Sequence, residues 1–219
     1  MKKFIIAALV LLLVCSTAVF ARYGEDPEVN IEDYTGFAIG GSFVNETYET
    51  DGGKIVDKAG QLYFGISDYA FFGSSPLGLY VDVGLLVNVK DSESDFVEKS
   101  PIYIDLTVGL GGRISMDRSS SLIFAVGPQF TYFTNEYTYY GYKIEKTYVS
   151  MGLGLDAEIM YKLGRDFYIS AGAKGSILFL KWMTREVTSG SGYEGSSSTD
   201  TEGYFGYRVT PKLTFYYMF

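Results

Sequence analysis

The strongest constraint on the fold is a period-two alternation of apolar and other residues that continues over long stretches. In 79–90, "LYVDVGLLVNVK", Leu79 and Val81 begin an apolar row, whereas Tyr80 and Asp82 begin a mixed row. The same alternation returns in "IYIDLTVGLGGRI" and "YVSMGLGLDAEIMY". Because successive side chains of a β-strand point to opposite faces, each stretch is predicted to be a strand whose two faces meet different environments.

Segments of this kind recur along the whole chain. Eight are predicted as strands: 35–46, 60–72, 79–90, 101–115, 121–134, 147–162, 167–181 and 204–219. Soluble strands are usually about 5–6 residues long, whereas these segments have the length of tilted strands that cross a bilayer. A membrane-spanning sheet has to close on itself, because an open edge would leave backbone groups unpaired in lipid.

The links between the segments alternate in length. "GSSP", "DRSSS" and "LGRD" are tight turns, whereas "NETYETDGGKIVDKAG", "KDSESDFVEKS", "TNEYTYYGYKIEK" and "MTREVTSGSGYEGSSSTDTEG" are long. Outer-membrane barrels have short periplasmic turns and longer outer loops. We therefore predict an all-β fold: an eight-stranded antiparallel up-and-down transmembrane β-barrel, with four longer extracellular loops and both termini on the periplasmic side. The alternative, a soluble sandwich with tyrosines at its rim, has shorter strands and less regular links.

Aromatic residues gather near both ends of the predicted strands, as in the two aromatic belts of membrane proteins. The belt at the short-turn end would contain Phe71, Phe72, Phe124, Phe167, Tyr217 and Phe219. The belt at the loop end would contain Tyr132, Phe133, Tyr137, Tyr148, Phe179, Trp182, Phe205 and Tyr207.

The first residues have the pattern of a secretory signal peptide. Lys2 and Lys3 precede an apolar run, and small residues lead to Ala21. An uncleaved anchor is the rival interpretation, but the apolar core 4–14 is shorter than the roughly 20 residues of a spanning helix. We expect a signal peptide at 1–21, a short periplasmic segment at 22–34 and the barrel at 35–219.

The composition of the mature chain excludes several classes of chemistry. The 18 basic residues less Lys2 and Lys3 leave 16 against 26 acidic residues, a formal charge of −10. An acidic chain is a poor partner for nucleic acid, where a basic patch carries affinity. The sequence has no histidine, and its one cysteine, Cys15, lies in the predicted signal peptide. No enzyme activity is predicted, because the commonest general base is missing and no carboxylate pair stands out.

The last strand carries the most specific motif. Apolar or aromatic residues occupy alternate positions up to the final residue: Leu213, Phe215, Tyr217 and Phe219. With this ending, the chain resembles the small eight-stranded outer-membrane barrels, such as the OmpA transmembrane domain, OmpX-type barrels and opacity proteins. The resemblance implies that the outer-membrane assembly machinery reads this ending, and that the row faces outer-membrane lipid. No peptidoglycan-binding domain follows the barrel, so tethering to the cell wall is not implied.

The positions predicted to face the lumen carry a network of charges: Asp82, Asp105, Arg113, Asp156, Glu158, Lys174, Arg208 and Lys212. Charges removed from water need partners. From their heights, Asp82 is expected to pair with Arg113, and Asp156 with Lys174. An eight-stranded barrel is just wide enough for side chains to fill it. The network is therefore interpreted as a polar plug, and a gated narrow pore stays open as the alternative.

Two prolines lie inside predicted strands. Pro128 and Pro211 each remove a ladder donor, so a bulge or local break is expected at "GPQ" and "TPK".

The outer loops offer contacts rather than catalysis. Four tyrosines in one loop are candidates for protein or sugar contacts: Tyr137, Tyr139, Tyr140 and Tyr142. Asp91, Glu93 and Asp95 have calcium-compatible oxygens but lack the features of an EF-hand, and are interpreted as a solvated acidic loop. No metal site or cofactor is predicted.

Together these observations favour a non-catalytic outer-membrane barrel. Its surface loops would serve interaction or adhesion, with host or surface ligands as possible partners, or membrane integrity. The alternative is a small gated pore, or a route for small hydrophobic molecules as in OmpW-like barrels.

Overall fold

A computed structural model describes residues 31–50, 53–73, 75–89, 102–139, 142–189, 192–200 and 204–219. These residues form nine strands: β1 (Ile31–Thr50), β2 (Gly53–Phe72), β3 (Leu77–Asn88), β4 (Ile102–Ser115), β5 (Ser120–Tyr139), β6 (Tyr142–Lys162), β7 (Phe167–Ser189), β8 (Gly192–Asp200) and β9 (Phe205–Met218). Within the described part of the chain, no helix is long and apolar enough to cross a membrane. The predicted signal peptide and most of the predicted periplasmic segment lie outside the described residues.

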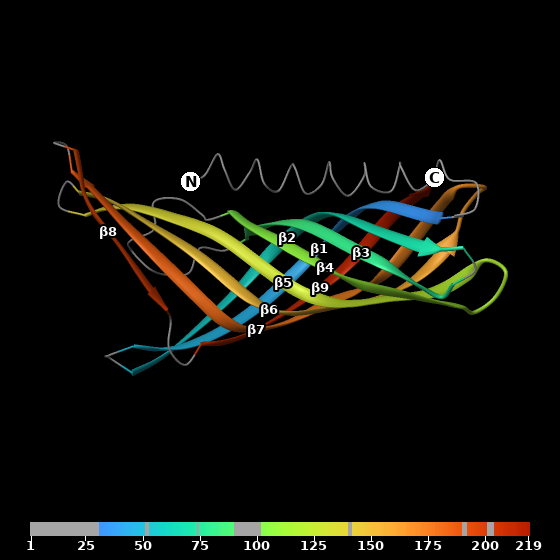
Figure 1. The fold of residues 1–219 in the computed structure, drawn as a ribbon, viewed down its shortest axis with the longest axis horizontal. Helices are drawn as coiled ribbons and strands as arrows, with labels where there is room; N and C mark the ends of the chain where they lie inside the picture. The colour runs from blue at the N-terminus through green and yellow to red at the C-terminus, as the bar shows by residue number, and fades with distance from the viewer. Residues whose placement is uncertain are drawn as a thin grey trace.

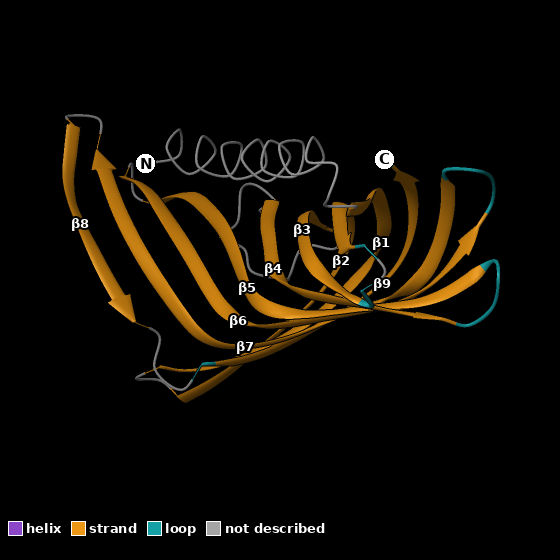
Figure 2. Cartoon of the chain, turned by 45° about the vertical axis from the view of Figure 1, so that its right-hand side comes forward, coloured by secondary structure: helices purple, strands orange, loops and turns teal. Residues whose placement is uncertain are grey.

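Eight of the strands close into one antiparallel barrel. Each strand from β1 to β7 pairs with the next, and β9 closes the ring by pairing with β7 on one side and β1 on the other. Figure 1 shows the strongly tilted strands of this ring, and Figure 2 shows β8 standing apart from it beside β7. The predicted eight-stranded antiparallel barrel is confirmed.

The strands run further outward than the alternation indicated. β1 and β2 pair up to Thr50 and Gly53, and β5 and β6 pair up to Tyr139 and Tyr142. β7 continues to Ser189 and pairs with β8. Much of three links that were predicted as loops is therefore hairpin, because backbone pairing continues where the apolar alternation stops.

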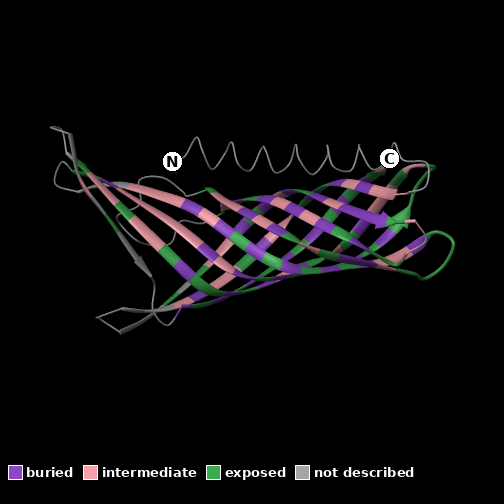
Figure 3. Ribbon diagram, viewed as in Figure 1, coloured by how far each residue is buried: buried purple, intermediate pink, exposed green. Residues whose placement is uncertain are grey.

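The two faces of the barrel differ as the alternation predicted. Along β9, exposed and buried residues alternate over almost the whole strand. Figure 3 shows the same banding across the other strands. The exposed positions carry large apolar side chains, for example Phe37, Ile39, Leu213 and Phe215. Exposed apolar rows of this extent belong against lipid, whereas the buried positions are largely polar.

Among the expected belt aromatics whose side chains the structure describes, most face outward, but three do not. Phe72, Phe124, Trp182 and Phe205 are exposed on the outer surface. Phe71, Phe133 and Tyr148 instead lie on the inner face, where Phe71 is fully buried and Tyr148 half-buried. The belt prediction was wrong for these three, because aromatic character alone does not tell which face of a strand a residue occupies.

The short turns lie together at one end of the barrel. In the β4–β5 turn, the Asp117 carboxylate accepts hydrogen bonds from the backbone N–H groups of Ser119 (2.6 Å) and Ser120 (2.8 Å). The Ser120 hydroxyl donates to the same carboxylate at 2.6 Å, and these bonds lower the pKa of Asp117. Gly73, after β2, has a positive φ of 58°, which glycine adopts readily. These local devices let strands reverse within a few residues.

The two prolines interrupt the ladder without shifting it. Between β4 and β5, pairing stops at Thr107–Gln129 and resumes in the same register at Leu110–Val126, so Pro128 lies in the gap. Pro211 lies in a similar gap between β1 and β9. A local break was expected at both places and is present. A bulge occurs elsewhere, at Met151/Gly152 on the β6–β7 pairing.

Candidate functional site

The middle of the lumen is crossed by an ion network centred on Lys174. The Lys174 ammonium binds Asp82 of β3 and Asp105 of β4, the latter at 2.8 Å between Nζ and Oδ2. Arg208 of β9 also binds Asp105, at 3.0 Å between Nη1 and Oδ1. All four side chains are buried. One lysine therefore links three strands across the barrel interior.

Lys212 holds a second set of carboxylates beside the first. Its ammonium lies 2.7 Å from Asp156 Oδ2, 2.9 Å from Glu158 Oε1 and 3.9 Å from Asp82 Oδ2. Because Asp82 contacts both lysines, the two sets form one network. The network contains four carboxylates and three cations, all at buried positions.

Neutral side chains add hydrogen bonds to the network. Tyr63 and Ser67 donate hydrogen bonds to Asp82 at 2.8 and 2.7 Å. Gln129 and Thr131 donate to Asp105 at 2.6 and 2.8 Å. In the second set, Tyr80 donates to Asp156, while Ser170 and Tyr216 donate to Glu158. Such satisfaction is what makes a buried ion network tolerable, since an unpaired buried charge is costly.

Glycines make room for these long side chains. A Cβ added at Gly84 or Gly65 would overlap the ring of Tyr63, which crosses both residues to reach Asp82. A Cβ at Gly36 would likewise overlap the ring of Tyr216. Glycine is thus required at these positions because an aromatic ring covers the backbone.

Both ion pairs expected from the sequence are wrong. Arg113 binds Glu32 instead of Asp82, and its Nη1 donates to the Tyr34 hydroxyl at 2.8 Å. Its guanidinium lies 4.7 Å from the centre of the Phe71 ring. Asp156 and Lys174 are direct register partners, yet each binds other groups. Height alone did not predict the pairs, because long side chains reach across the lumen to non-adjacent strands.

Aromatic rings gather in the lumen near its short-turn end. Tyr34, Tyr69, Phe71, Tyr80 and Tyr216 belong to one buried cluster. The Tyr69 and Tyr80 rings lie 4.6 Å apart, and Tyr69 and Phe71 stack at 6.0 Å. The Arg113 guanidinium lies over two rings of this aromatic cluster, those of Tyr34 and Phe71.

The loop end holds a third ion pair that was not predicted. Lys181 of β7 binds Glu46 of β1, with 2.6 Å between Nζ and Oε2. Both residues are buried, although Glu46 was placed where the predicted strand 35–46 passes into the first long link. Lys181 was assigned no lumenal role because the alternation along β7 would turn it outward. The bulge opposite Met151 and Gly152 adds Phe179 to β7, and the alternation after it is reversed.

The row at the end of β9 lies on the outer surface. Leu213, Phe215, Tyr217 and Phe219 are all exposed, and Phe219 is the most exposed at 74%. The Phe219 backbone N–H donates to the Asp33 carbonyl at 3.0 Å. The end of the chain is therefore fixed beside β1 with its aromatic row facing lipid.

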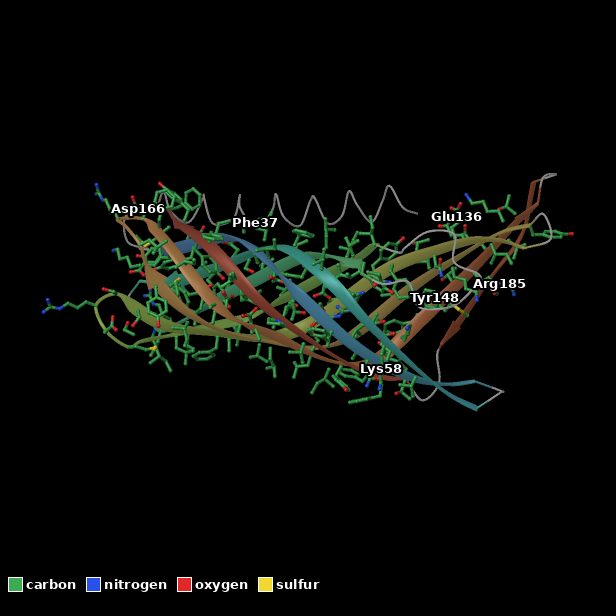
Figure 4. All side chains as sticks on the ribbon, turned by 180° about the vertical axis from the view of Figure 1, so that it is seen from behind. Phe37, Lys58, Glu136, Tyr148, Asp166 and Arg185 are labelled. Carbon is green, nitrogen blue, oxygen red and sulfur yellow. The ribbon has the colours of Figure 1, made fainter. Side chains whose placement is uncertain are left out.

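The loop candidates lie only partly in the described structure. Tyr137 and Tyr139 end β5, Tyr142 begins β6 and is exposed, and Tyr140 lies outside the described residues. Asp91, Glu93 and Asp95 also lie outside them. Within the described ranges, no group of three or more metal-binding side chains converges. Figure 4 shows Glu136, Tyr148 and Arg185 at the outer end of the barrel and Asp166 at the opposite end.

Comparison with known proteins gives one family and several similar structures. The chain matches the model of the "Outer membrane protein beta-barrel domain" over residues 7–198. No curated protein matches it. A major outer membrane protein from Thermus thermophilus is similar, with a TM-score of 0.53, 13% identity and coverage of 84% of this chain and 99% of that one. OprG from Pseudomonas aeruginosa has a TM-score of 0.52, 14% identity and coverage of 85% and 95%.

Neisserial surface protein A (NspA) is a further similar structure, with a TM-score of 0.45, 12% identity and coverage of 83% of this chain and 95% of that one. At these identities the similarities concern the fold alone. The family model, in contrast, spans most of the sequence and agrees with the closed barrel and its apolar outer face. The chain belongs to the outer membrane protein beta-barrel domain family and is a protein of the bacterial outer membrane.

Proposed function

We propose that this barrel is a non-catalytic surface protein whose outer hairpins bind partners outside the cell, while its lumen stays closed. The observation that carries the proposal is the extension of paired strands beyond the barrel ring. β4 last pairs with β5 at Tyr103–Phe133, but β5 continues to Tyr139 in register with β6. Six further residues correspond to about 20 Å along the strand.

The extension is a small sheet of β5, β6, β7 and β8 with two differently charged faces. Glu136, Glu145 and Glu186 are direct neighbours on one face, where Lys143 pairs with Glu136. Lys146 and Arg185 are direct neighbours on the other face. A preformed, charged sheet binds a partner with less ordering cost than a mobile loop, so it suits interaction or adhesion. Its partner would be a host or surface ligand with a polar surface.

The contents of the lumen support the same proposal. The ion network, the aromatic cluster and the Lys181–Glu46 pair lie in series along the barrel. A gated pore is the second candidate, and buried polar atoms without protein partners favour it, among them Arg208 Nε and Nη2 and Gln129 Oε1. A route for small hydrophobic molecules through the barrel is a variant of this second candidate.

The test compares adhesion with conductance. Replacing 135–146 by an Asn-Gly turn should abolish binding to cells or surface extracts, while the barrel still folds. The same replacement of 48–55, at the β1–β2 tip, is the matched control, because it also leaves two register partners, Thr47 and Val56, beside the turn. Single-channel recordings of the refolded chain, with Asp82→Ala and Arg113→Ala beside it, should be silent. Discrete conductance steps that change in these variants would favour the gated pore over the closed surface protein.

We also propose that the assembly machinery of the outer membrane recognises the aromatic row of β9. The row is exposed and lies at the end of the closing strand, between β1 and β7.

A further inference from the structure

The Lys181 ammonium at the outer mouth is surrounded by aromatic rings. It lies 5.5 Å from the ring centre of Phe133, 5.3 Å from that of Tyr148 and 5.0 Å from that of Tyr204. Glu46 completes the surroundings with its carboxylate, 2.6 Å from the ammonium. We call these four residues, Phe133, Tyr148, Tyr204 and Glu46, the mouth cage.

The mouth cage is assembled from four separate parts of the barrel. Phe133 of β5 and Tyr148 of β6 are register partners whose rings stack at 4.5 Å and 12°. Tyr204 precedes β9, and Glu46 lies in β1. Gly206 lets the last two approach, because a Cβ there would lie 3.1 Å from the Tyr204 hydroxyl oxygen and 3.3 Å from Glu46 Cγ. The arrangement depends on the closed ring.

This combination of aromatic rings and one carboxylate has the chemistry of an organic-cation site. Aromatic faces attract ammonium groups within about 6 Å of the ring centre, and such cages recognise alkylated ammonium ions. The Glu46 carboxylate alone would be enough to balance the charge of Lys181. The three rings therefore add a preference for alkylammonium ions over inorganic cations. We propose that the mouth cage binds small alkylammonium ions and that Lys181 is its resident occupant.

Lysine is an occupant that can be displaced. Its ammonium is a compact charge on a flexible four-carbon stem, with rotamer freedom to regain when it leaves. Tyr148 is only half-buried, so the cage borders the outer opening of the lumen. An external amine and Lys181 then compete for one site, and the amine stabilises the state in which the lysine points to solvent.

The effect of Lys181 on the affinity for an external amine can be predicted. A tethered group acts as if present at about millimolar concentration, so an external amine has to exceed that level in the wild type. Removing the tethered lysine should therefore raise the affinity for an external amine at least about tenfold. Binding should also stabilise the variant, because it neutralises the buried Glu46 carboxylate that the substitution leaves without Lys181.

The first experiment is calorimetric titration of refolded wild type and Lys181→Ala with tetramethylammonium and n-butylammonium chloride. The detergent should be a non-ionic glycoside, because a quaternary ammonium head group would itself compete. We expect Lys181→Ala to bind both ions at least tenfold more tightly than the wild type, and n-butanol not to bind. In the double variant with Lys181→Ala and Glu46→Gln, this gain in affinity should be lost. Equal affinities in wild type and Lys181→Ala would overturn the proposal.

Lys162→Ala is the matched control. Its ammonium lies 5.6 Å from one ring, that of Tyr168, at the opposite end of the barrel. This substitution should create no site, and a gain equal to that of Lys181→Ala would show that the effect is not specific to the mouth cage.

A second experiment uses the unmodified protein, so the outcome does not depend on the folding of a variant. The rate at which an amine-acylating reagent modifies Lys181 should rise several-fold when tetramethylammonium is added, because the expelled lysine becomes accessible. The rate at Lys162 should not change. An unchanged rate at Lys181 up to molar salt would contradict the proposal. Neither experiment depends on what the outer hairpins bind, so failure here leaves the proposed function untouched.

Discussion

At the scale of single residues, Lys174 is the group on which the central network most depends. It is the cation shared by Asp82 and Asp105, and all three side chains are buried. Lys174→Met removes the charge but keeps the length of the side chain. It leaves two buried carboxylates with less compensation, and loss of one partner from a buried ion network costs about 3–5 kcal/mol. We expect a loss of that size in the free energy of unfolding, measured by urea titration in lipid vesicles.

An exposed lysine gives the control for this prediction. Lys143 binds Glu136 at 2.9 Å, but its side chain is 52% exposed. Exposed ion pairs contribute about 0–1 kcal/mol, so Lys143→Met should be nearly neutral. Adding Asp82→Asn to Lys174→Met should recover part of the loss. Similar losses for the two lysine variants would show that burial does not govern the network.

Sequence alternation predicted most of the buried charges of the lumen but not which of them meet. Seven of the eight predicted charges are buried inside, and Arg113 lies partly buried at the short-turn end. Their partners depend on side-chain reach across the ring, which no local pattern encodes. Lys181 escaped prediction because one bulged residue, Phe179, reverses the alternation that follows it. Glu46 escaped because it is the last residue of its predicted strand, beyond the apolar row, whereas β1 continues to Thr50.

At the scale of elements, the outer hairpins behave differently from the loops that the sequence indicated. The residues of β6 from 143 to 149 have paired neighbours on both sides, in β5 and β7. The residues of β5 from 134 to 139 pair with β6 only within the described sheet. Polar composition, as in "TNEYTYYGYKIEK", is typical of loops, yet here cross-strand pairing overrides it. Strand boundaries were therefore the weakest part of the sequence-based prediction.

Hydrogen exchange distinguishes these two kinds of strand. Amides of 143–149 should exchange slowly, because both edges of β6 are hydrogen-bonded. Alternate amides of 134–139 should exchange at least about tenfold faster, because an edge strand leaves every second N–H without a ladder partner. The measurement is mass-spectrometric or NMR exchange of the refolded barrel. Rapid exchange throughout both segments would mean that the hairpin does not persist beyond the membrane, and would remove the main support for the proposed function.

At the scale of the whole molecule, the closing strand links the stability of the barrel to its assembly. β9 pairs with β1 and β7, so the barrel exists only when the last residues are in place. The Phe219 side chain nevertheless adds little to the finished structure. It is 74% exposed, and its ring meets that of Tyr217 at 4.7 Å. A residue that contributes little to packing but ends the closing strand is well placed for recognition during insertion.

Phe219→Ala separates these two roles. If the assembly machinery reads the terminal row, this variant should reach the outer membrane at a several-fold lower level than the wild type. The free energy of unfolding of the purified, refolded variant should fall by about 1 kcal/mol or less, because the substituted side chain is exposed.

Phe37→Ala is the control: Phe37 is also exposed on the lipid face and pairs with Phe215, but it is not part of the terminal row. Its level in the membrane should stay near that of the wild type. Equal levels for the two variants, measured by immunoblot of outer-membrane fractions, would mean that the terminal row contributes only its contact with lipid.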